Sequence, residues 1–358
     1  MATFLQLHLL TSYPPACLNR DDLNRPKTAM MGGVPRLRAS SQSLKRAWRT
    51  SDLFEGALKD HIGTRTKLKG VKVFKRLRGA NVPEESAKKW AQAIASQFGK
   101  LKAANANKPL HDLEIEQLAH FSPEEESAID ALADRLAQEQ RLPTEEELRL
   151  LRRDHTAADI ALFGRMLADS PGFNTEAACQ VAHAITVHRA PVEDDYFTAV
   201  DDLNTREVNA GSSHIGEQGF GAGLFYSYVC VNCDQLMDNL SGNVELTKNA
   251  IRALVESAAK VAPAGKQNSF GTRSQAFYVL AEKGNRQPRG LSLAFMKPVT
   301  DYGEGMLVNA VTALETMRTN LDKVYYQGQS LESRSINALK GDGDFDVLLS
   351  FASDCRGV

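Results

Sequence analysis

The sequence lacks the features of several specialised protein classes. Its 358 residues include no apolar run near the roughly 18 residues that cross a bilayer, so no transmembrane helix is predicted. Residues 1–10 lack the basic region and small-residue cleavage site of a signal peptide, and their partly alternating apolar side chains favour a first β-strand. The five cysteines are scattered and odd in number, which argues against a disulfide framework and favours a reducing cytoplasm.

An excess of charge of either sign is also absent. Lysine and arginine number 43, and aspartate and glutamate number 44, which gives a net charge of −1. Any nucleic-acid site must therefore be a local patch. The total hides an uneven distribution, because residues 20–49 and 65–78 are basic whereas residues 112–154 are acidic. With 42% hydrophobic and 24% charged residues, the chain is neither collagen-like nor wholly disordered.

Common catalytic and metal-binding signatures are missing as well. The motifs GxxxxGKS/T, GxSxG, HExxH and GxGxxG with a following acid do not occur. The CxxC of Cys230 and Cys233 ends a predicted strand and has no second ligand pair at zinc spacing. Asp21 and Asp22 lie beside a basic stretch, where a catalytic role and a loop or helix-entry role both remain open. The sequence predicts no metal, no cofactor and no enzymatic activity.

Local signals in the first half predict a helix followed by a helical insertion. Ser40 is the expected N-cap of a first helix. Roughly residues 57–170 are predicted to be helical, with capping boxes that begin at Ser122 and Thr144. Within this range, residues 65–78 are expected to form a basic surface loop. Cys179 and His183 are four residues apart and are expected to lie on a helix, where packing is the favoured role.

After residue 190 the pattern changes to that of an α+β sheet. Residues 191–223 are polar, acidic and glycine-rich, and are predicted to be a long loop. Loops of this length are usually functional or disordered. The remaining elements alternate as in a split βαβ sheet: strand 224–229, helix 246–261, strand 276–281, helix 305–325 and strand 345–351.

The basic stretch 20–49 is the strongest binding signal. It mixes lysine and arginine with serine, asparagine and glutamine. Cations neutralise phosphates, and neutral donors bind sugar and phosphate oxygens. An ordinary solvated face remains the competing interpretation. The basic run 65–78 is more simply a surface feature, and contact with target DNA there is a further hypothesis.

Several local strings together resemble a known family. The strings are CLNRDD (17–22), MGG (31–33), SSQSLKRA (40–47), DIALFGRM (159–166), AHAITVH (182–188), DYFTAVDDL (195–203) and SHIG (213–216). In this order and spacing they resemble the CasC (Cse-type) backbone subunit of Cascade, the type I-E CRISPR surveillance complex. The resemblance covers residues 1–50 and 155–230 well. The remainder is similar mainly in element order, with PAGKQ (263–267) as a local match.

The resemblance implies a fold shaped like a right hand. An RRM/ferredoxin-like palm would carry a helical fingers insertion and a protruding thumb loop. The implied palm consists of residues 1–56, 171–190 and 224–358. The fingers would be residues 57–170, and the thumb would be residues 191–223.

The resemblance also implies a function. The chain would be a non-catalytic, CRISPR RNA (crRNA)-binding subunit that assembles as a helical filament along the guide RNA. It would present the guide for base pairing with invading target DNA in antiviral defence. Its implied partners are further copies of itself, arranged head-to-tail, and the other Cascade subunits, which are the guide-processing endonuclease, the 5′-end cap subunit, and the large and small subunits. No membrane is implied.

The family's functional positions can be carried over to this sequence. The implied RNA-binding residues are Arg20, Lys27, Ser40, Gln42, Lys45, Arg46, Arg49 and Thr198. Met166 of one subunit and Ile215 of the next subunit's thumb would form an apolar wedge at a kinked guide base. One alternative is a type III-like backbone subunit with metal-dependent RNA endonuclease activity at Asp21 or Asp22. A second alternative is a stand-alone RRM-like RNA-binding protein.

Overall fold

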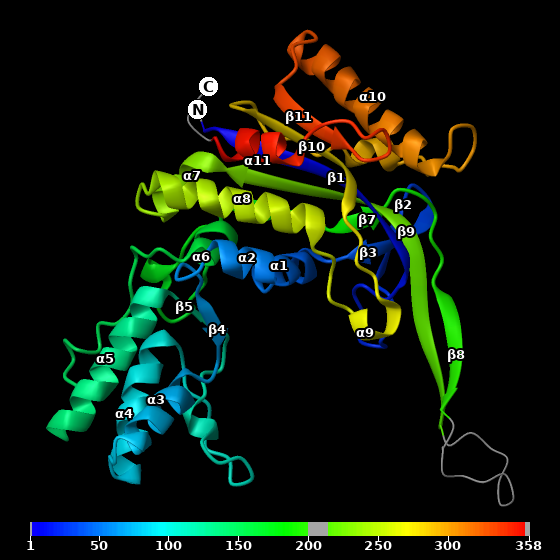
Figure 1. Cartoon of the computed structure of the whole chain (residues 1–358). Helices are drawn as coiled ribbons and strands as arrows, with labels where there is room; N and C mark the ends of the chain where they lie inside the picture. The colour runs from blue at the N-terminus through cyan, green and yellow to red at the C-terminus, as the bar shows by residue number, and fades with distance from the viewer. Residues whose placement is uncertain (1, 200–213, 355–358) are drawn as a thin grey trace, which may run out of the picture. The chain divides into compact units, whose positions relative to one another are not determined.

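The computed structural model describes residues 2–199 and 214–354 (Figure 1). The chain divides into two compact units. Unit 1 consists of Met1–Phe54, Val181–Cys230 and Ile251–Val358, and unit 2 of Glu55–Gln180 and Val231–Ala250. The predicted insertion 57–170 lies within unit 2, whereas the second stretch of unit 2 lies within the range 224–358 that was assigned to the palm. The assignment of palm, fingers and thumb stays a prediction.

Unit 1 is built on a large, mainly antiparallel sheet. Within the described residues, nine strands join the sheet, in the order β11-β10-β1-β9-β7-β3-β2, with β8 and β6 also paired to β9; the first two residues of β6 are the last two of the stretch Glu55–Gln180 of unit 2. The mixed α/β architecture with this sheet confirms the coarse α+β prediction. The strands are β1 (Phe4–Ala16), β2 (Thr28–Met31), β3 (Val34–Ala39), β6 (Cys179–Val181), β7 (Ala184–Thr186), β8 (Glu193–Ala199), β9 (His214–Asn232), β10 (Ala276–Gly284) and β11 (Glu332–Asn337).

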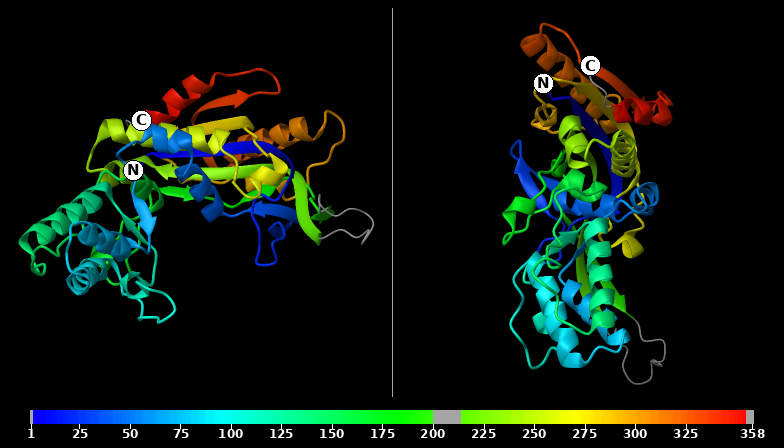
Figure 2. Two further views of the ribbon diagram at one scale, coloured as in Figure 1. Left: turned by 60° about the horizontal axis from the view of Figure 1, so that its bottom comes forward. Right: turned by 90° about the vertical axis from the view of Figure 1, so that its left-hand side faces the viewer.

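Helices cover both faces of this sheet. On one face, α10 (Met306–Tyr326) and the 3₁₀ turn η4 (Ser292–Phe295) pack on sheet residues such as Leu10, Tyr226 and Leu280. Figures 1 and 2 show α1 (Ser41–Arg49), α11 (Phe345–Ser353) and the end of α8 (Val244–Lys260) on the other side of the sheet. The short helices α2 (Asp52–Ala57) and α9 (Gln267–Phe270) complete the elements of this unit, although α2 and α8 each continue into unit 2.

Unit 2 is largely helical and has its own core. Trp90, Ile94 and Phe98, which repeat at helical spacing, pack with Ile129 and Leu136. The capping box at Ser122 is confirmed, because its hydroxyl accepts from the backbone N–H of the glutamate three residues later, whose carboxylate accepts from the Ser122 N–H. The elements are α3 (Lys69–Gly79), α4 (Glu84–Ala95), α5 (Pro123–Glu139), α6 (Ala158–Phe163), α7 (Cys233–Asn239), β4 (Thr64–Thr66), β5 (Ala119–Phe121), η1 (Ser96–Phe98), η2 (His111–Leu113) and η3 (Pro171–Phe173).

Several predicted elements were correct and two near the carboxyl end were not. Strands β1 and β10 and helices α1, α8 and α10 lie where the sequence predicted them. The predicted strand 345–351 is wrong, because these residues form α11. Asp344 caps that helix by accepting from the Val347 N–H at 2.9 Å. Strand β11 was missed, since its largely exposed, polar sequence carries no apolar alternation.

The predicted loop 191–223 contains a β-hairpin. Its described part consists of β8 and the first part of β9, which pair antiparallel from Glu193 opposite Phe220 to Ala199 opposite His214. The glycines of this stretch allow close packing. A Cβ at Gly216 would lie 2.3 Å from the ring of Phe197. Glycine richness therefore marks a crowded strand here, although it indicated a loop in the sequence.

Three further local predictions were wrong. Residues 65–78 are not a loop, because most of them belong to β4 and α3. Cys179 is in β6 and His183 follows it, so neither lies on a helix. The prediction that the Cys230–Cys233 motif ends a strand was correct, because β9 ends at Asn232 and α7 begins at Cys233; both cysteines are buried. The helix predicted to begin at Thr144 is also absent. The Thr144 N–H donates to Glu147 Oε2 at 2.9 Å and the Glu147 N–H donates to Thr144 Oγ1 at 3.3 Å, as in a capping box, but these bonds close a turn.

The described residues contain no helix that is both long and apolar enough to cross a bilayer.

Buried charged groups join α10 to the sheet in unit 1. Glu282 on β10 is fully buried and accepts from Arg318 Nε at 2.9 Å, with Arg289 Nη2 at 3.4 Å. His8 on β1 lies on the other side of the carboxylate, with Nε2 3.3 Å from Glu282 Oε2. Its Nδ1 is 2.9 Å from the hydroxyl of Tyr226 on β9. This network fixes three strands and one helix at a single point.

The ionisation states of Glu282 and His8 in this network follow from their burial and from the charges beside them. Burial alone would raise the pKa of Glu282, but the interactions with His8, Arg289 and Arg318 lower it to about 2. Burial lowers the pKa of His8 below its ordinary value near 6.5. Glu282 is therefore charged and His8 neutral at pH 7.

We expect His8 to make stability fall as the pH falls below about 6.5. In that range the unfolded chain binds a proton at His8 that the folded chain does not. The slope approaches about 1.4 kcal/mol per pH unit for one proton. His8→Gln is expected to remove this contribution, which urea unfolding between pH 7.5 and 5.5 would measure. His111→Gln, at a histidine in unit 2, is the matched control, and an equal slope in wild type and His8→Gln would contradict the prediction.

Candidate nucleic-acid interface

Helix α1 has one buried apolar face and carries polar and basic side chains on its other side. Ser40 caps the helix, because its hydroxyl accepts from the Ser43 N–H at 3.3 Å. Leu44 and Trp48 are buried on the inner side. Gln42 and Arg46 are exposed, and Lys45 and Arg49 are half-buried. The predicted RNA-binding side chains of this helix therefore avoid its buried face.

A tight loop after β1 holds Arg20 beside this helix. The Asn19 side-chain oxygen accepts from the Ser40 N–H at 2.9 Å, which ties the loop to the start of α1. Asp21 Oδ1 accepts from the backbone N–H groups of Leu23 and Arg25, at 3.0 and 2.9 Å. Arg20 itself is exposed and donates to Asn24 Oδ1 at 3.3 Å. The loop thus has a defined conformation that directs Arg20 outward.

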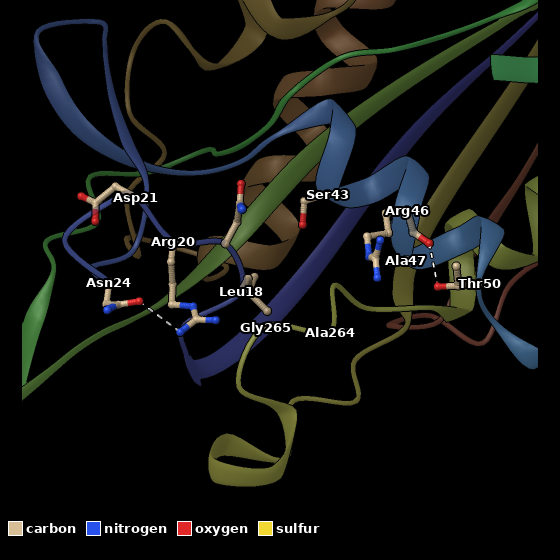
Figure 3. A pocket seen from close by; sticks show the side chains of 11 residues that line it. Leu18, Arg20, Asp21, Asn24, Ser43, Arg46, Ala47, Thr50, Ala264 and Gly265 are labelled. Carbon is tan, nitrogen blue, oxygen red and sulfur yellow. Dashed lines mark hydrogen bonds between the residues drawn. The ribbon is translucent and has the colours of Figure 1, made fainter. Parts of the chain in front are cut away.

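Together these elements enclose a cavity of about 390 Å³ (Figure 3). Arg20 and Arg46 reach it from the loop and from α1, and Ser43 lies between them. A third wall comes from residues 264–265. Gly265 is required there, because a Cβ would lie 2.3 Å from the carbonyl oxygen of Leu18. Two guanidinium groups and a hydroxyl around an open cavity suit a phosphate with its sugar.

A second basic cluster lies on β3 and the segment before β7. Arg38 Nη1 donates to His183 Nδ1 at 2.7 Å, so that ring nitrogen is the acceptor. Burial and the charges of Arg38 and Lys27 lower the pKa of His183. Lys27 was predicted as a site residue from the sequence, whereas Arg38 and His183 were not. Strand β7 is only three residues long and buries Ala184 and Thr186 while Ile185 is half-buried, so the sequence carries no apolar alternation that could have predicted this juxtaposition.

Two residues of the stretch 20–49, Arg36 and Ser40, have structural roles. Arg36 is fully buried and donates to the carbonyl oxygens of Thr186 at 3.1 Å and Phe295 at 2.8 Å. Ser40 is only 6% exposed, and its hydroxyl already serves the helix cap. An RNA contact by Ser40 stays a prediction.

The remaining predicted residues lie on other elements. Thr198 is exposed on β8, opposite Ile215 on β9. The side chain of Ile215 lies outside the described part of the structure. Met166 belongs to unit 2, where its side chain is 73% exposed.

Much of the basic run 65–78 is neutralised within unit 2. Lys69 is buried and forms an ion pair with Glu126, which also binds Lys72 Nζ at 2.8 Å. Arg76 binds Asp134 on α5, with Nε 2.6 Å from Oδ1. The acidic face of α5 therefore offsets charge on α3, and a contact of this run with target DNA stays a hypothesis.

The two aspartates near the cavity differ in their surroundings. Asp21 is occupied by the loop hydrogen bonds described above, whereas Asp22 is exposed. Among the residues that the structure describes, no group of three or more His, Cys, Asp or Glu side chains has a metal-binding arrangement.

Comparison with known proteins gives one family and two similar structures. The profile of the family described as CT1975-like protein (Cas_CT1975) matches residues 5–346. A chain described as "CRISPR RNA-guided surveillance complex, pre-nicking" is 28% identical, with a TM-score of 0.84 over 98% of this chain and 100% of that chain. A chain described as "CRISPR RNA-guided surveillance complex" has a TM-score of 0.73 at 22% identity, over 99% and 100%. No curated protein matches the sequence.

Proposed function

Because the chain belongs to the family of CT1975-like proteins, we propose that it is a crRNA-binding subunit of a CRISPR surveillance complex. The observation that carries this proposal is the cavity between Arg20 and Arg46, in a fold that matches a surveillance-complex chain over nearly its whole length. The cavity offers cationic and neutral donors for phosphate and sugar. Such contacts are independent of base sequence, which suits a protein that must accept any guide.

The proposed guide path uses the outward side of α1 and the two basic clusters. Arg20, Arg46 and Lys27 would bind phosphates, with Arg38 and His183 beside Lys27. Gln42, Lys45 and Arg49 would contact the same strand from α1, and Thr198 would contact it from β8. Sequence would be read by base pairing between the guide and target DNA.

The finer proposal is a backbone subunit of the type I-E Cascade. In it, the sheet of unit 1 would be the RRM-like palm and the helices 57–170 the fingers. The hairpin region 191–223 would be the thumb, which reaches the neighbouring copy. A head-to-tail interface that does not close on itself builds a helical filament, here along the RNA. Met166 and Ile215 would form the wedge at a displaced base, since unstacking one base step costs only about a few kcal/mol.

We propose that the subunit is non-catalytic and cytoplasmic, and that its other partners are the remaining Cascade subunits. Asp21 supports the non-catalytic role, because its carboxylate accepts the hydrogen bonds that close the loop that carries Arg20. The rival activity is metal-dependent RNA cleavage at Asp21 or Asp22. Incubation with complementary RNA and Mg²⁺ is expected to leave the RNA intact. Cleavage that disappears in Asp22→Ala would establish the rival instead.

The proposed assembly is tested by light scattering with absorbance detection. We expect the mass to rise in whole-subunit steps as the added RNA is lengthened. A single protein copy on RNA of every length would favour a stand-alone RNA-binding protein. Protein that ignores RNA, alone and after co-expression with the other complex subunits, would refute RNA binding.

A further inference from the structure

Arg165 in unit 2 is a buried cation at the centre of several chain segments. Its guanidinium donates from Nη1 to both carboxylate oxygens of Glu125, at 2.9 and 2.8 Å. From Nη2 it donates to the carbonyl oxygens of Arg152 at 2.8 Å and Phe173 at 3.0 Å. Nη1 also lies 3.3 Å from the carbonyl oxygen of His120. Such a group holds separate loops in one arrangement. Its removal would leave the buried Glu125 carboxylate with two backbone N–H donors, of Ser122 and Arg152, but no charge partner, and several carbonyls would lose their donor.

The residue after this anchor is the exposed Met166. Arg165 and Thr175 exchange backbone hydrogen bonds of 3.1 and 3.0 Å. On the other side, Leu167 is buried and its N–H donates to Asn174 Oδ1 at 2.7 Å. Met166 therefore stands between two fixed, buried residues, which explains how an apolar side chain can remain 73% exposed.

An alternative position for the methionine lies close by. Met166 lines one side of a hollow of about 80 Å³, whose other walls are partly apolar, from Phe98 and Leu118, and partly polar, from residues such as Lys100 and Asp169. Methionine is flexible and fills apolar gaps readily. A less constrained segment would let Met166 turn into this hollow and remove it from the surface.

We infer that Arg165 is the positioning residue of Met166, and that its ion pair with Glu125 holds the methionine outward as a preformed knob for a nucleic-acid base. The inference rests on the wedge role given to Met166 under the proposed function. A side chain that separates two bases must keep its conformation, because stacking of the bases favours its displacement. Methionine is flexible, and the buried Arg165–Glu125 ion pair fixes the backbone that carries it.

The test uses the full chain assembled on RNA that carries 2-aminopurine at one position, moved along the strand in a series of RNAs. Unstacking raises 2-aminopurine fluorescence, and wild type is expected to show this at one recurring position per bound subunit. Met166→Ala is expected to abolish the rise. Arg165→Lys is expected to reduce it at least twofold, because one ammonium group cannot reach the same set of oxygens. RNA affinity is expected to stay within about twofold of wild type.

Two further variants separate positioning from general stability. Glu125→Gln removes the charge partner while keeping a side-chain oxygen, and we expect the same twofold loss as for Arg165→Lys. Thr144→Ala removes a capping hydroxyl of the same unit that bonds to Glu147 and to neither Arg165 nor Glu125, and we expect the full fluorescence rise. A full rise in both Arg165→Lys and Glu125→Gln would overturn the positioning role while leaving the wedge intact. A full rise in Met166→Ala would instead overturn the wedge, and with it the positioning role.

Discussion

Replacing Glu282 by glutamine is expected to lower the free energy of unfolding by about 3 kcal/mol at pH 7. The substitution leaves the largely buried guanidinium groups of Arg289 and Arg318 without a charge that now lies 2.9–3.4 Å away. Breaking a buried ion pair from one side costs about 3–5 kcal/mol. We expect a loss at the lower end of this range, because Arg289 retains its ion pair with Asp322 and Arg318 retains its ion pair with Glu315.

Urea unfolding followed by tryptophan fluorescence measures this effect. Trp48 belongs to unit 1 and Trp90 to unit 2, so the change should appear in the Trp48 transition. Glu256→Gln is the matched control. Its carboxylate pairs with Lys260 on the same unit's α8, where both side chains are partly exposed, and about 0.5 kcal/mol is expected. A loss below about 1 kcal/mol for Glu282→Gln would show that the network contributes little.

The double variant Arg20→Ala/Arg46→Ala is expected to weaken binding of unrelated RNAs alike, by at least about tenfold at low salt. Each lost phosphate contact reduces the slope of log affinity against log salt by about 0.7 for single strands, so the double variant should lose about 1.4. Fluorescence anisotropy with two guide-length RNAs across a salt series measures both quantities.

Lys323→Ala is the control for lost positive charge. Lys323 is exposed on α10, across the sheet from α1, and its removal should leave the slope unchanged. A slope as steep in the double variant as in wild type would place the RNA elsewhere. A loss confined to one RNA sequence would contradict backbone contacts.

The parts of the fold that the sequence predicted are those encoded by neighbours in the chain. The caps at Ser40 and Ser122 act over three residues, and the stripe through Trp90 and Ile94 repeats within one helix. β11 offers no comparable signal, because it is polar and its partner β10 lies about 50 residues earlier. β8 pairs with the neighbouring β9, but its run of three acidic residues and the glycines of β9 obscured the hairpin. The apolar run in α11 fits a strand or a buried helix equally well, and its cap at Asp344 was the signal that decided it.

The candidate site was predictable only where it is local. Arg20 and Arg46 come from one basic stretch, and the structure brings both to one cavity. The pair of Arg38 with His183 depends on a contact across 145 positions of sequence, and the wall at Gly265 on a contact with Leu18 across 247 positions, by the difference of residue numbers. Local patterns hold no information about such distant contacts.

The place of β1 has a consequence for how the molecule is made. In the sheet, β1 lies between β10 and β9, and both of these strands come roughly 200 residues or more after it in the sequence. A ribosome adding about 5–20 residues per second leaves Leu5, Leu7 and Leu9 without sheet neighbours for at least about ten seconds. Pairing at such sequence separation is slow. During synthesis β1 is therefore an exposed apolar segment that chaperones should bind, and truncation before β10 should yield aggregates.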